Sequence, residues 1–238
     1  MPVAIGEVEA LFRYPVKSMR GESLDAAALG WHGIEGDRRL AFRRVGERGG
    51  FPWLSGSGLA DLLQFTPTRH DDATGLPTHV RTPEGDELPL FGSQLAADVE
   101  RRFGERVEML QLKHGTFDEA PVSVIASDTI REVSRLAGCA PDVRRFRPNV
   151  LVRSSGAVPF EEDGWVGGML TFGDDGPAIS VTMRDVRCVM LNLDPDGGPR
   201  APEMMKAVVR ANENHAGVYG AVTRIGRLAV GQTVRLHR

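Results

Sequence analysis

Short strand-like runs separated by clusters of glycine and proline are the feature that most restricts how this sequence can fold. Runs rich in aliphatic and aromatic residues, bounded by turn residues, are typical of β-strands. The glycine and proline clusters lie at residues 49–58, 83–92, 154–159, 164–168 and 173–177 and supply the turns. The predicted strands are Val8–Tyr14, Arg39–Arg44, His79–Thr82, Val107–Gln111, Val122–Ala126, Val150–Val152, Ala178–Met183, Val189–Leu193 and Thr233–His237.

Three segments have the pattern of helices instead. Ser93 and Ser127 are the predicted N-caps of Gln94–Phe103 and Asp128–Ala137, and each of these segments is followed by a glycine. The third, Pro202–Ala216, begins at a proline and has one apolar side. The helices do not alternate regularly with the strands, and no Gly-x-Gly-x-x-Gly motif follows a strand. The sequence therefore predicts a mostly β protein with a few helices, of the α+β class and built on a β-barrel.

The chain of 238 residues is long enough for one large domain or two small ones. We expect a smaller N-terminal β domain over residues 1–90 and a larger barrel domain over residues 91–238. The boundary is expected somewhere within residues 85–120, and the two parts could pack as one unit.

Charge and hydropathy argue against two classes of partner. The formal net charge of −3 argues against a nucleic-acid-binding surface over the whole protein. The N-terminus carries Glu7 and Glu9, and no later stretch approaches about 18 uninterrupted apolar residues, so no signal peptide or membrane anchor is predicted. The two cysteines lack the spacing of a zinc site or a disulfide framework and fit a reducing compartment. We expect a soluble cytoplasmic protein.

Cys188 is the residue with the clearest chemical potential. It follows Arg187 and lies close to Arg184 in the sequence, and nearby positive charge stabilises a thiolate. A thiolate attacks electrophiles and binds soft metals. The alternative is that Cys188 is a small buried apolar residue, the usual role of a free cysteine. Cys139 lies in a small apolar segment, and we interpret it as a packing or loop residue.

Cationic and polar side chains gather in four clusters beside turn residues. Arginine has a planar group that suits phosphate and carboxylate recognition, and the helix start at Ser127 offers backbone N–H groups to an anion. If the clusters converge, they form a pocket for a phosphorylated or otherwise anionic ligand, with a thiolate at one side. The clusters are Tyr14–Gly21 with Lys17 and Ser18, Gly33–Arg39 with Arg38, Arg144–Asn149 with Arg147 and Asn149, and Arg184–Cys188.

Each cluster also has a simpler interpretation. The arginines could be solvated or paired with some of the 32 acidic residues. The acidic run Phe160–Trp165 could ligate a hard cation, or it could pair with arginines and order its own loop, which we favour.

Taken together and in their order, these segments resemble the MOSC family, named after the C-terminal domain of molybdenum cofactor sulfurase, with its associated N-terminal β-barrel domain. The resemblance extends over residues 14–231, nearly the whole chain. The matching segments are Tyr14–Ser18, Gly36–Arg38, Phe117–Asp118 with Ala120–Val122, Arg145–Asn149, Phe160–Trp165, Arg187–Cys188 with Asp194–Pro195, and Gly226–Gly231.

The best-understood relatives in this family are the mitochondrial amidoxime reducing components and bacterial reductases of N-hydroxylated bases. The resemblance implies that Cys188 is the catalytic cysteine and binds the molybdenum of a Mo-pyranopterin, the molybdenum cofactor. The contacts that it implies to this cofactor are Lys17, Ser18, Arg38, Ser127, Arg147, Asn149 and Arg187.

The activity implied by the resemblance is the reduction of N-hydroxylated or N-oxide-type small molecules by a molybdenum-dependent oxidoreductase. Two cysteines are too few for a ferredoxin-type iron–sulfur cluster, so we expect a separate electron donor of the ferredoxin or flavin reductase type. One alternative is a sulfur carrier or sulfurtransferase with a persulfide on Cys188, and another is a non-catalytic carrier of the cofactor. Pyridoxal phosphate is associated with the family only through an attached desulfurase domain, which these residues do not contain. The substrate and the oligomeric state stay open.

Overall fold

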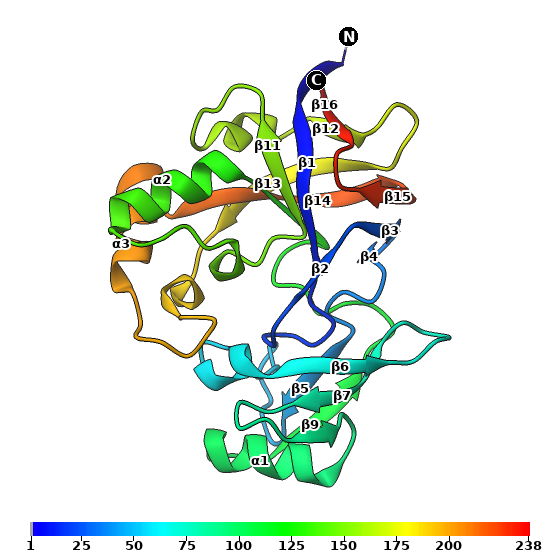
Figure 1. The fold of residues 1–238 in the computed structure, drawn as a ribbon, viewed down its shortest axis with the longest axis vertical. Helices are drawn as coiled ribbons and strands as arrows, with labels where there is room; N and C mark the ends of the chain where they lie inside the picture. The colour runs from blue at the N-terminus through cyan, green and yellow to red at the C-terminus, as the bar shows by residue number, and fades with distance from the viewer. Residues whose placement is uncertain (1) are drawn as a thin grey trace.

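A closed barrel of seven strands is the larger part of the computed structural model, which describes residues 2–238 (Figure 1). In order around the barrel, the strands are β1 (Val3–Arg13), β11 (Val150–Ser154), β10 (Val122–Ala126), β14 (His215–Arg224), β13 (Ala178–Val186), β12 (Met169–Phe172) and β16 (Thr233–His237). The ring closes because β1 pairs with both β11 and β16. Strands β10 and β11 run parallel to each other, and the other neighbours in the ring are antiparallel.

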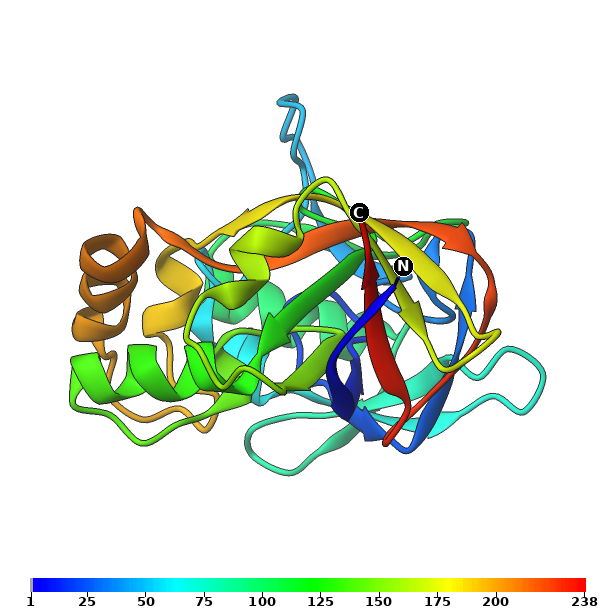
Figure 2. The same ribbon diagram turned by 90° about the horizontal axis from the view of Figure 1, so that it is seen from above.

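Two helices cover one side of this barrel. Helices α2 (Ser127–Ala137) and α3 (Pro202–Asn212) lie side by side, as both ribbon views show (Figures 1 and 2). Successive residues of a strand point to opposite faces, so β10 has one face towards the barrel and one towards the helices. Val124 accordingly belongs to the barrel core, whereas Ile125 packs with apolar residues of the two helices. This double burial explains why every residue of β10 is buried.

A smaller unit lies below the barrel in Figure 1 and has its own apolar core. Leu62, Phe65 and Leu95 are buried there, so these elements do not depend on the barrel for burial. The unit contains β5 (Leu40–Arg44) paired with β9 (Val107–Gln111), the sheet of β6 (Thr66–His70), β7 (Pro77–Arg81) and β8 (Glu87–Pro89), and α1 (Ser93–Phe103). Shorter strands beside the barrel are β2 (Glu22–Leu24), β3 (Ala26–Gly30), β4 (Gly33–Ile34) and β15 (Gly226–Ala229).

The sheets are not divided between residues 1–90 and 91–238. Strand β1 pairs with C-terminal strands of the barrel, and β15 pairs with β3. Strand β9 instead pairs with β5 of the smaller unit. In terms of sheet pairing, the smaller unit is inserted between β4 and β10.

The predicted class, mostly β with a few helices, is confirmed, but the predicted serine caps are wrong. Ser93 and Ser127 are the first residues of their helices, and the N-cap residues are Gly92 and Ala126, neither of which makes a side-chain capping bond. Both helices end as predicted at a glycine in the left-handed conformation. None of the helices within residues 2–238 has the length and apolar character needed to cross a membrane.

Two predictions in the C-terminal third are also wrong. Val189–Leu193 is not a strand, because Val189–Asn192 forms a short 3-10 helix in which Leu191 N donates to the Cys188 carbonyl at 3.1 Å. The helix predicted over Pro202–Ala216 stops at Asn212. Glu213 and Asn214 adopt positive φ angles of 52° and 70°, which end the helix and start β14.

Candidate functional site

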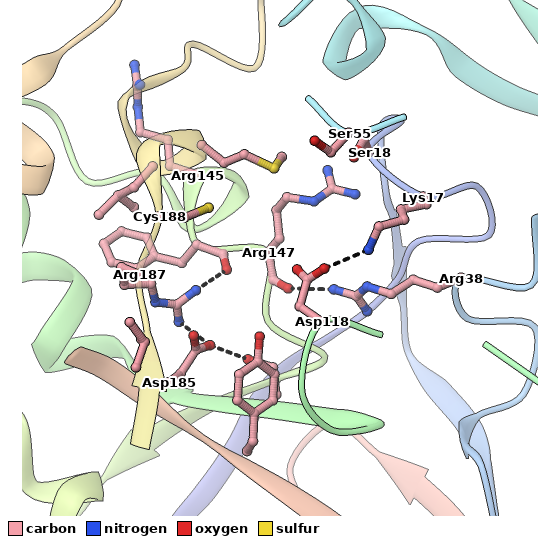
Figure 3. Close-up of a pocket in the computed structure, with 16 residues that line it drawn as sticks. Lys17, Ser18, Arg38, Ser55, Asp118, Arg145, Arg147, Asp185, Arg187 and Cys188 are labelled. Atoms are coloured by element: carbon pink, nitrogen blue, oxygen red, sulfur yellow. Dashed lines mark hydrogen bonds and ion pairs between the residues drawn. The ribbon is translucent and has the colours of Figure 1, made fainter. Parts of the chain in front are cut away.

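A pocket rich in cations lies where loops beside the smaller unit meet the barrel (Figure 3). Cys188 and Arg187 reach it from the end of β13, and Lys17 and Arg38 reach it from the opposite side. Arg147 lies between these two groups (Figure 3). Six of the eight predicted site residues therefore line one pocket, namely Lys17, Ser18, Arg38, Arg147, Arg187 and Cys188.

Backbone hydrogen bonds fix the loop that carries Lys17 and Ser18 against the loop that carries Arg38. Lys17 N donates to the Leu40 carbonyl at 2.7 Å, and Arg38 N donates to the Tyr14 carbonyl at 2.8 Å. The buried carboxylate of Asp37 accepts a further bond from Tyr14 N at 2.7 Å. The two predicted clusters therefore form one rigid wall.

Three residues of the pocket have strained backbones. Ser18, Arg38 and Arg147 have φ angles of 65°, 50° and 53°, in the left-handed region that non-glycine residues seldom adopt. Such strain costs on the order of 1–3 kcal/mol per residue and is concentrated at functional sites in proteins. Its occurrence at three cofactor-contact candidates supports a functional role for this wall.

Two guanidinium groups stack on one buried tyrosine. The carbon of the Arg147 guanidinium lies 4.2 Å from the centroid of the Tyr14 ring, and that of Arg38 lies 4.9 Å from it. Burial raises the pKa of Tyr14 to about 12, so the ring stays neutral. Arg38 is also paired with Asp37 and, despite burial, that carboxylate keeps the pKa of Arg38 above its usual value.

Arg147 differs from Arg38 because no carboxylate within residues 2–238 pairs with it. Its Nη2 atom is buried and has no hydrogen-bond partner in the described part of the chain. Burial of this group lowers the pKa of Arg147 to about 10, which still leaves it charged at neutral pH. A buried guanidinium with an unused donor is suited to an anionic ligand.

Lys17 completes the cationic wall. Its side chain is buried, and Nζ lies 2.8 Å from Asp118 Oδ1 and 3.3 Å from the Thr116 carbonyl. Burial lowers the pKa of Lys17, and the Asp118 carboxylate partly opposes this effect. Asp118 itself is exposed, so this carboxylate can exchange its partner for water.

Cys188 is exposed in the pocket and follows a firmly held arginine. Arg187 Nε donates to the Ala216 carbonyl at 2.7 Å and Nη1 donates to the Phe146 carbonyl at 2.8 Å. Arg187 Nη2 lies 2.9 Å from the Asp185 carboxylate as an ion pair, without the alignment of a hydrogen bond. Arg187 therefore positions the Cys188 segment, and all three of its nitrogens contact protein groups.

A glycine makes room for this arginine. Gly217 has a φ of +87°, and a Cβ atom there would lie 2.9 Å from the Val124 carbonyl oxygen and 3.0 Å from Arg187 Nη2. A larger residue at this position would be strained and would displace the guanidinium. The placement of Cys188 thus depends on a residue of β14 that the sequence analysis did not single out.

The second arginine expected beside Cys188 lies elsewhere. Arg184 pairs with Asp163 at 3.1 Å and with Glu213 at 3.2 Å, and it does not line the pocket. The reason is strand alternation, since neighbouring odd and even positions of β13 face opposite sides. The pair with Asp163 agrees with the interpretation that the acidic run Phe160–Trp165 binds an arginine and orders its own loop.

Asn149 and Ser127 do not line the pocket. Asn149 Nδ2 donates to Asp37 at 3.1 Å and to the Phe12 carbonyl at 3.3 Å, and its Oδ1 accepts from Ser123 N at 3.1 Å. Its amide therefore supports the loop wall from behind. Ser127 is buried at the start of α2, and its hydroxyl has no partner among the described residues.

Several lining residues were not candidates from the sequence. They include Ser123, Asp185 and Tyr219. Asp185 could have been found, because it lies two positions before Arg187, which directly follows β13, and alternate residues of an extended chain share a face. Ser123 and Tyr219 carried no such signal. Cys139 packs partly buried against the α2–α3 core, as predicted.

This chain is similar in sequence and in fold to known proteins. Residues 111–235 match the MOSC domain family. Mitochondrial amidoxime reducing component 2 of Bos taurus is 26% identical over 289 aligned residues, which cover 97% of this chain and 83% of that protein. The crystal structure of the YuaD protein of Bacillus subtilis superposes with a TM-score of 0.54 at 14% identity and covers 100% of this chain and 98% of YuaD. This last likeness establishes a shared fold.

Proposed function

Because the chain belongs to the MOSC domain family, we propose that it binds a molybdenum cofactor and reduces N-hydroxylated or N-oxide-type small molecules. The observation that carries the proposal is the pocket itself, in which the exposed thiol of Cys188 faces Lys17, Arg38 and Arg147. The name of the bovine relative refers to the reduction of amidoximes, which contain an N–OH group.

The donor set fits this cofactor. A Mo-pyranopterin presents a metal that accepts a soft sulfur ligand and a phosphate that accepts charge-assisted hydrogen bonds. Cys188 would ligate the metal, and Lys17, Ser18, Arg38 and Arg147 would hold the phosphorylated pterin. The unused buried Nη2 of Arg147 supports this assignment, because such a group is costly without an anionic partner.

The remaining residues would hold the site in shape. Arg187 and Gly217 would fix the Cys188 segment, while Asn149 and Asp37 would support the loops that carry Arg38 and Arg147. The bound molybdenum would supply the two-electron exchange of the reaction. A separate redox protein would deliver the electrons, since two cysteines cannot hold an iron–sulfur cluster.

The test is the molybdenum and pterin content per chain after expression in a cofactor-replete host. Cys188→Ala is the decisive variant, and Cys139→Ala is its matched control, because Cys139 lies outside the pocket. We expect near-stoichiometric cofactor in the wild type and in the Cys139 variant, and loss or loosening in the Cys188 variant. Turnover of an amidoxime with an artificial electron donor then tests the reaction.

A cofactor-free wild type would contradict the proposal. In that case the exposed thiol of Cys188 favours the sulfur-carrier alternative, since a persulfide needs an accessible sulfur. The signature of that chemistry is a cyanide-labile sulfur that the Cys188→Ala variant lacks. Bound cofactor that passes to an apo-acceptor without any turnover would instead identify a carrier.

A further inference from the structure

Asp185 is a buried carboxylate in the pocket that none of the cofactor contacts above involves. It lies near the end of β13, is 2% exposed, and lines the pocket together with Arg187 and Tyr219. The Ser123 hydroxyl donates to its Oδ2 atom at 3.2 Å. Buried aspartates are usually paired, and the partner of Asp185 is the Arg187 guanidinium at 2.9 Å.

Support of Arg187 does not account fully for this carboxylate. The guanidinium of Arg187 is already held by the carbonyls of Ala216 and Phe146, at 2.7 and 2.8 Å. These two bonds do not depend on the charge of Asp185. Asp185 can therefore gain or lose a proton while Arg187, and with it Cys188, stays in place.

The surroundings of Asp185 favour proton exchange near neutral pH. Burial raises the pKa of Asp185 to about 6, although the Arg187 guanidinium opposes the shift. Carboxyl groups whose pKa lies near the working pH are effective general acids. The charged or titratable groups and the hydroxyl that face Asp185 come from the neighbouring strands and loops, and they are Arg187, Ser123, Tyr219, Asp118 and Arg38.

We propose that Asp185 is the proton donor of this pocket and protonates the oxygen that leaves an N-hydroxylated substrate. The proposal rests on the function proposed above. In that reaction the N–O bond breaks, two electrons from the redox partner reduce the substrate, and the partner is oxidised. One proton converts the departing hydroxyl into water and a second goes to the nitrogen. Asp185 supplies the first and recovers it from solvent.

The decisive variant is Asp185→Asn, which keeps the shape of the side chain but cannot donate a carboxyl proton. In the cofactor-loaded wild type, we expect kcat/KM to fall on the alkaline side as Asp185 ionises. In the Asp185→Asn variant we expect kcat to fall about 100-fold, the alkaline limb to disappear and the molybdenum content to be retained. Asp185→Glu, which keeps a carboxyl group, should restore in part the fall of kcat/KM at alkaline pH.

An infrared pH titration gives a readout independent of turnover. A protonated-carboxyl band that titrates near neutral pH should be present in the wild type and absent in Asp185→Asn. Asp163→Asn is the matched control, because Asp163 pairs with another arginine of β13 outside the pocket. That variant should keep the band, the rate and the pH profile. An Asp185→Asn enzyme with wild-type rate and profile would overturn the proposal.

Ser123→Ala keeps the proposal testable if Asp185→Asn fails to fold or to load cofactor. Loss of the hydroxyl removes a hydrogen bond that favours the charged carboxylate, so the pKa of Asp185 should rise. Both the alkaline limb and the infrared titration should then move to higher pH, and superimposable profiles would overturn the role of Asp185. A loaded wild type that reduces no N-hydroxylated compound would overturn the proposed function itself, whereas an active wild type with unchanged variants overturns only the proton donor.

Discussion

The barrel wall of the pocket, formed by Asp185, Arg187 and Tyr219, and the loop wall, formed by Lys17, Arg38 and Arg147, use their charges differently. On the barrel wall, Arg187 donates to two backbone carbonyls through Nε and Nη1, and its Nη2, which makes no hydrogen bond, forms an ion pair with Asp185. On the loop wall, Arg147 keeps a buried donor without a partner among the described residues. A buried cation that is paired with a carboxylate and bonded to carbonyls holds a geometry, whereas a buried cation without a carboxylate partner retains capacity for an anionic ligand. The barrel wall thus positions the thiol, and the loop wall is suited to binding.

Arg187→Met should produce the largest loss of stability. The substitution removes two bonds to buried carbonyls and leaves the buried Asp185 without its cation. Loss of one partner of a buried ion pair costs about 3–5 kcal/mol. The measurement is the free energy of unfolding in urea. Arg184→Met is the control and should cost no more than about 1 kcal/mol, because its ion pairs are partly exposed. Equal losses in the two variants would mean that the bonds of Arg187 hold the barrel wall no more firmly than partly exposed ion pairs would.

Glu162→Gln tests an unsatisfied buried group that lies outside the pocket. Glu162 is 0% exposed and accepts a bond from Thr129 Oγ1 at 2.8 Å, while its Oε1 atom has no partner in the described chain. Burial raises the pKa of Glu162 from 4.5 to about 7. The folded state therefore holds the proton more tightly, and its contribution to stability is full below the unfolded pKa and is lost as the pH rises through the folded value.

The expected size of this loss is roughly 3 kcal/mol between about pH 4 and about pH 8. Glu162→Gln should remove that part of the pH dependence and be more stable than the wild type at the alkaline end. Urea unfolding at a series of pH values measures it, with the exposed Glu119→Gln as the control. Identical slopes in wild type and Glu162→Gln would mean that Glu162 is ionised in the fold at neutral pH. Glu162 lies outside the pocket, where no ligand compensates for its unpaired oxygen, so this group only lowers the stability of the fold.

Arg147→Met should separate binding from stability. No carboxylate within residues 2–238 pairs with Arg147, so the substitution leaves no buried anion without a partner. The free energy of unfolding should therefore change by less than about 1 kcal/mol. Cofactor retention should fall about 10- to 100-fold, because a hydrogen bond to a charged group contributes about 1.5–3 kcal/mol. Molybdenum and pterin remaining after gel filtration measure the effect. A variant that is clearly less stable than the wild type but retains the cofactor equally well would assign Arg147 a structural role.

The contrast between the two arginines was beyond the reach of the sequence. The acceptors of Arg187 lie 29 and 41 residues away, at Ala216 and Phe146. Both arginines occur in short turn segments with recognisable chemistry, so their membership in a site was predictable. Which of the two is bonded to backbone carbonyls depends on the tertiary fold, which brings the Ala216 and Phe146 carbonyls to Arg187.

Strand β14 shows the same limit at the level of secondary structure. The sequence predicts a helix up to Ala216, which includes the first two residues of β14, and predicts no strand over the rest of β14. The helix ends because Glu213 and Asn214 take the left-handed conformation, which their side chains do not require. Tyr219 and Gly217, which complete the barrel wall, were missed for this reason. Strands β9, β10 and β16, in contrast, have the predicted bounds, because turn or bend residues precede each of them.

Arg20→Met should have the smallest effect on the free energy of unfolding, although the ion pair of Arg20 connects the loop wall to the turn that follows Cys188. Arg20 Nη2 donates to Asp196 Oδ1 at 2.9 Å and to the Pro195 carbonyl at 3.0 Å. Arg144 holds the same carboxylate at 2.7 Å, and together with Arg20 it lowers the pKa of Asp196 to about 2. The stability from this pair is present above the unfolded pKa and is lost as the pH falls through about 2.

Solvent limits the strength of this connection, since the Asp196 side chain is 55% exposed. We therefore expect Arg20→Met to lower the free energy of unfolding by less than about 1 kcal/mol, and the difference to shrink further in molar salt. Urea unfolding at low and high ionic strength measures both. A loss as large as that of Arg187→Met, or one insensitive to salt, would mean that the two walls are joined by this contact and do not hold their geometry independently. A small loss of stability that shrinks in salt would mean that the Cys188 thiol is held in place by the barrel, through the bonds of Arg187.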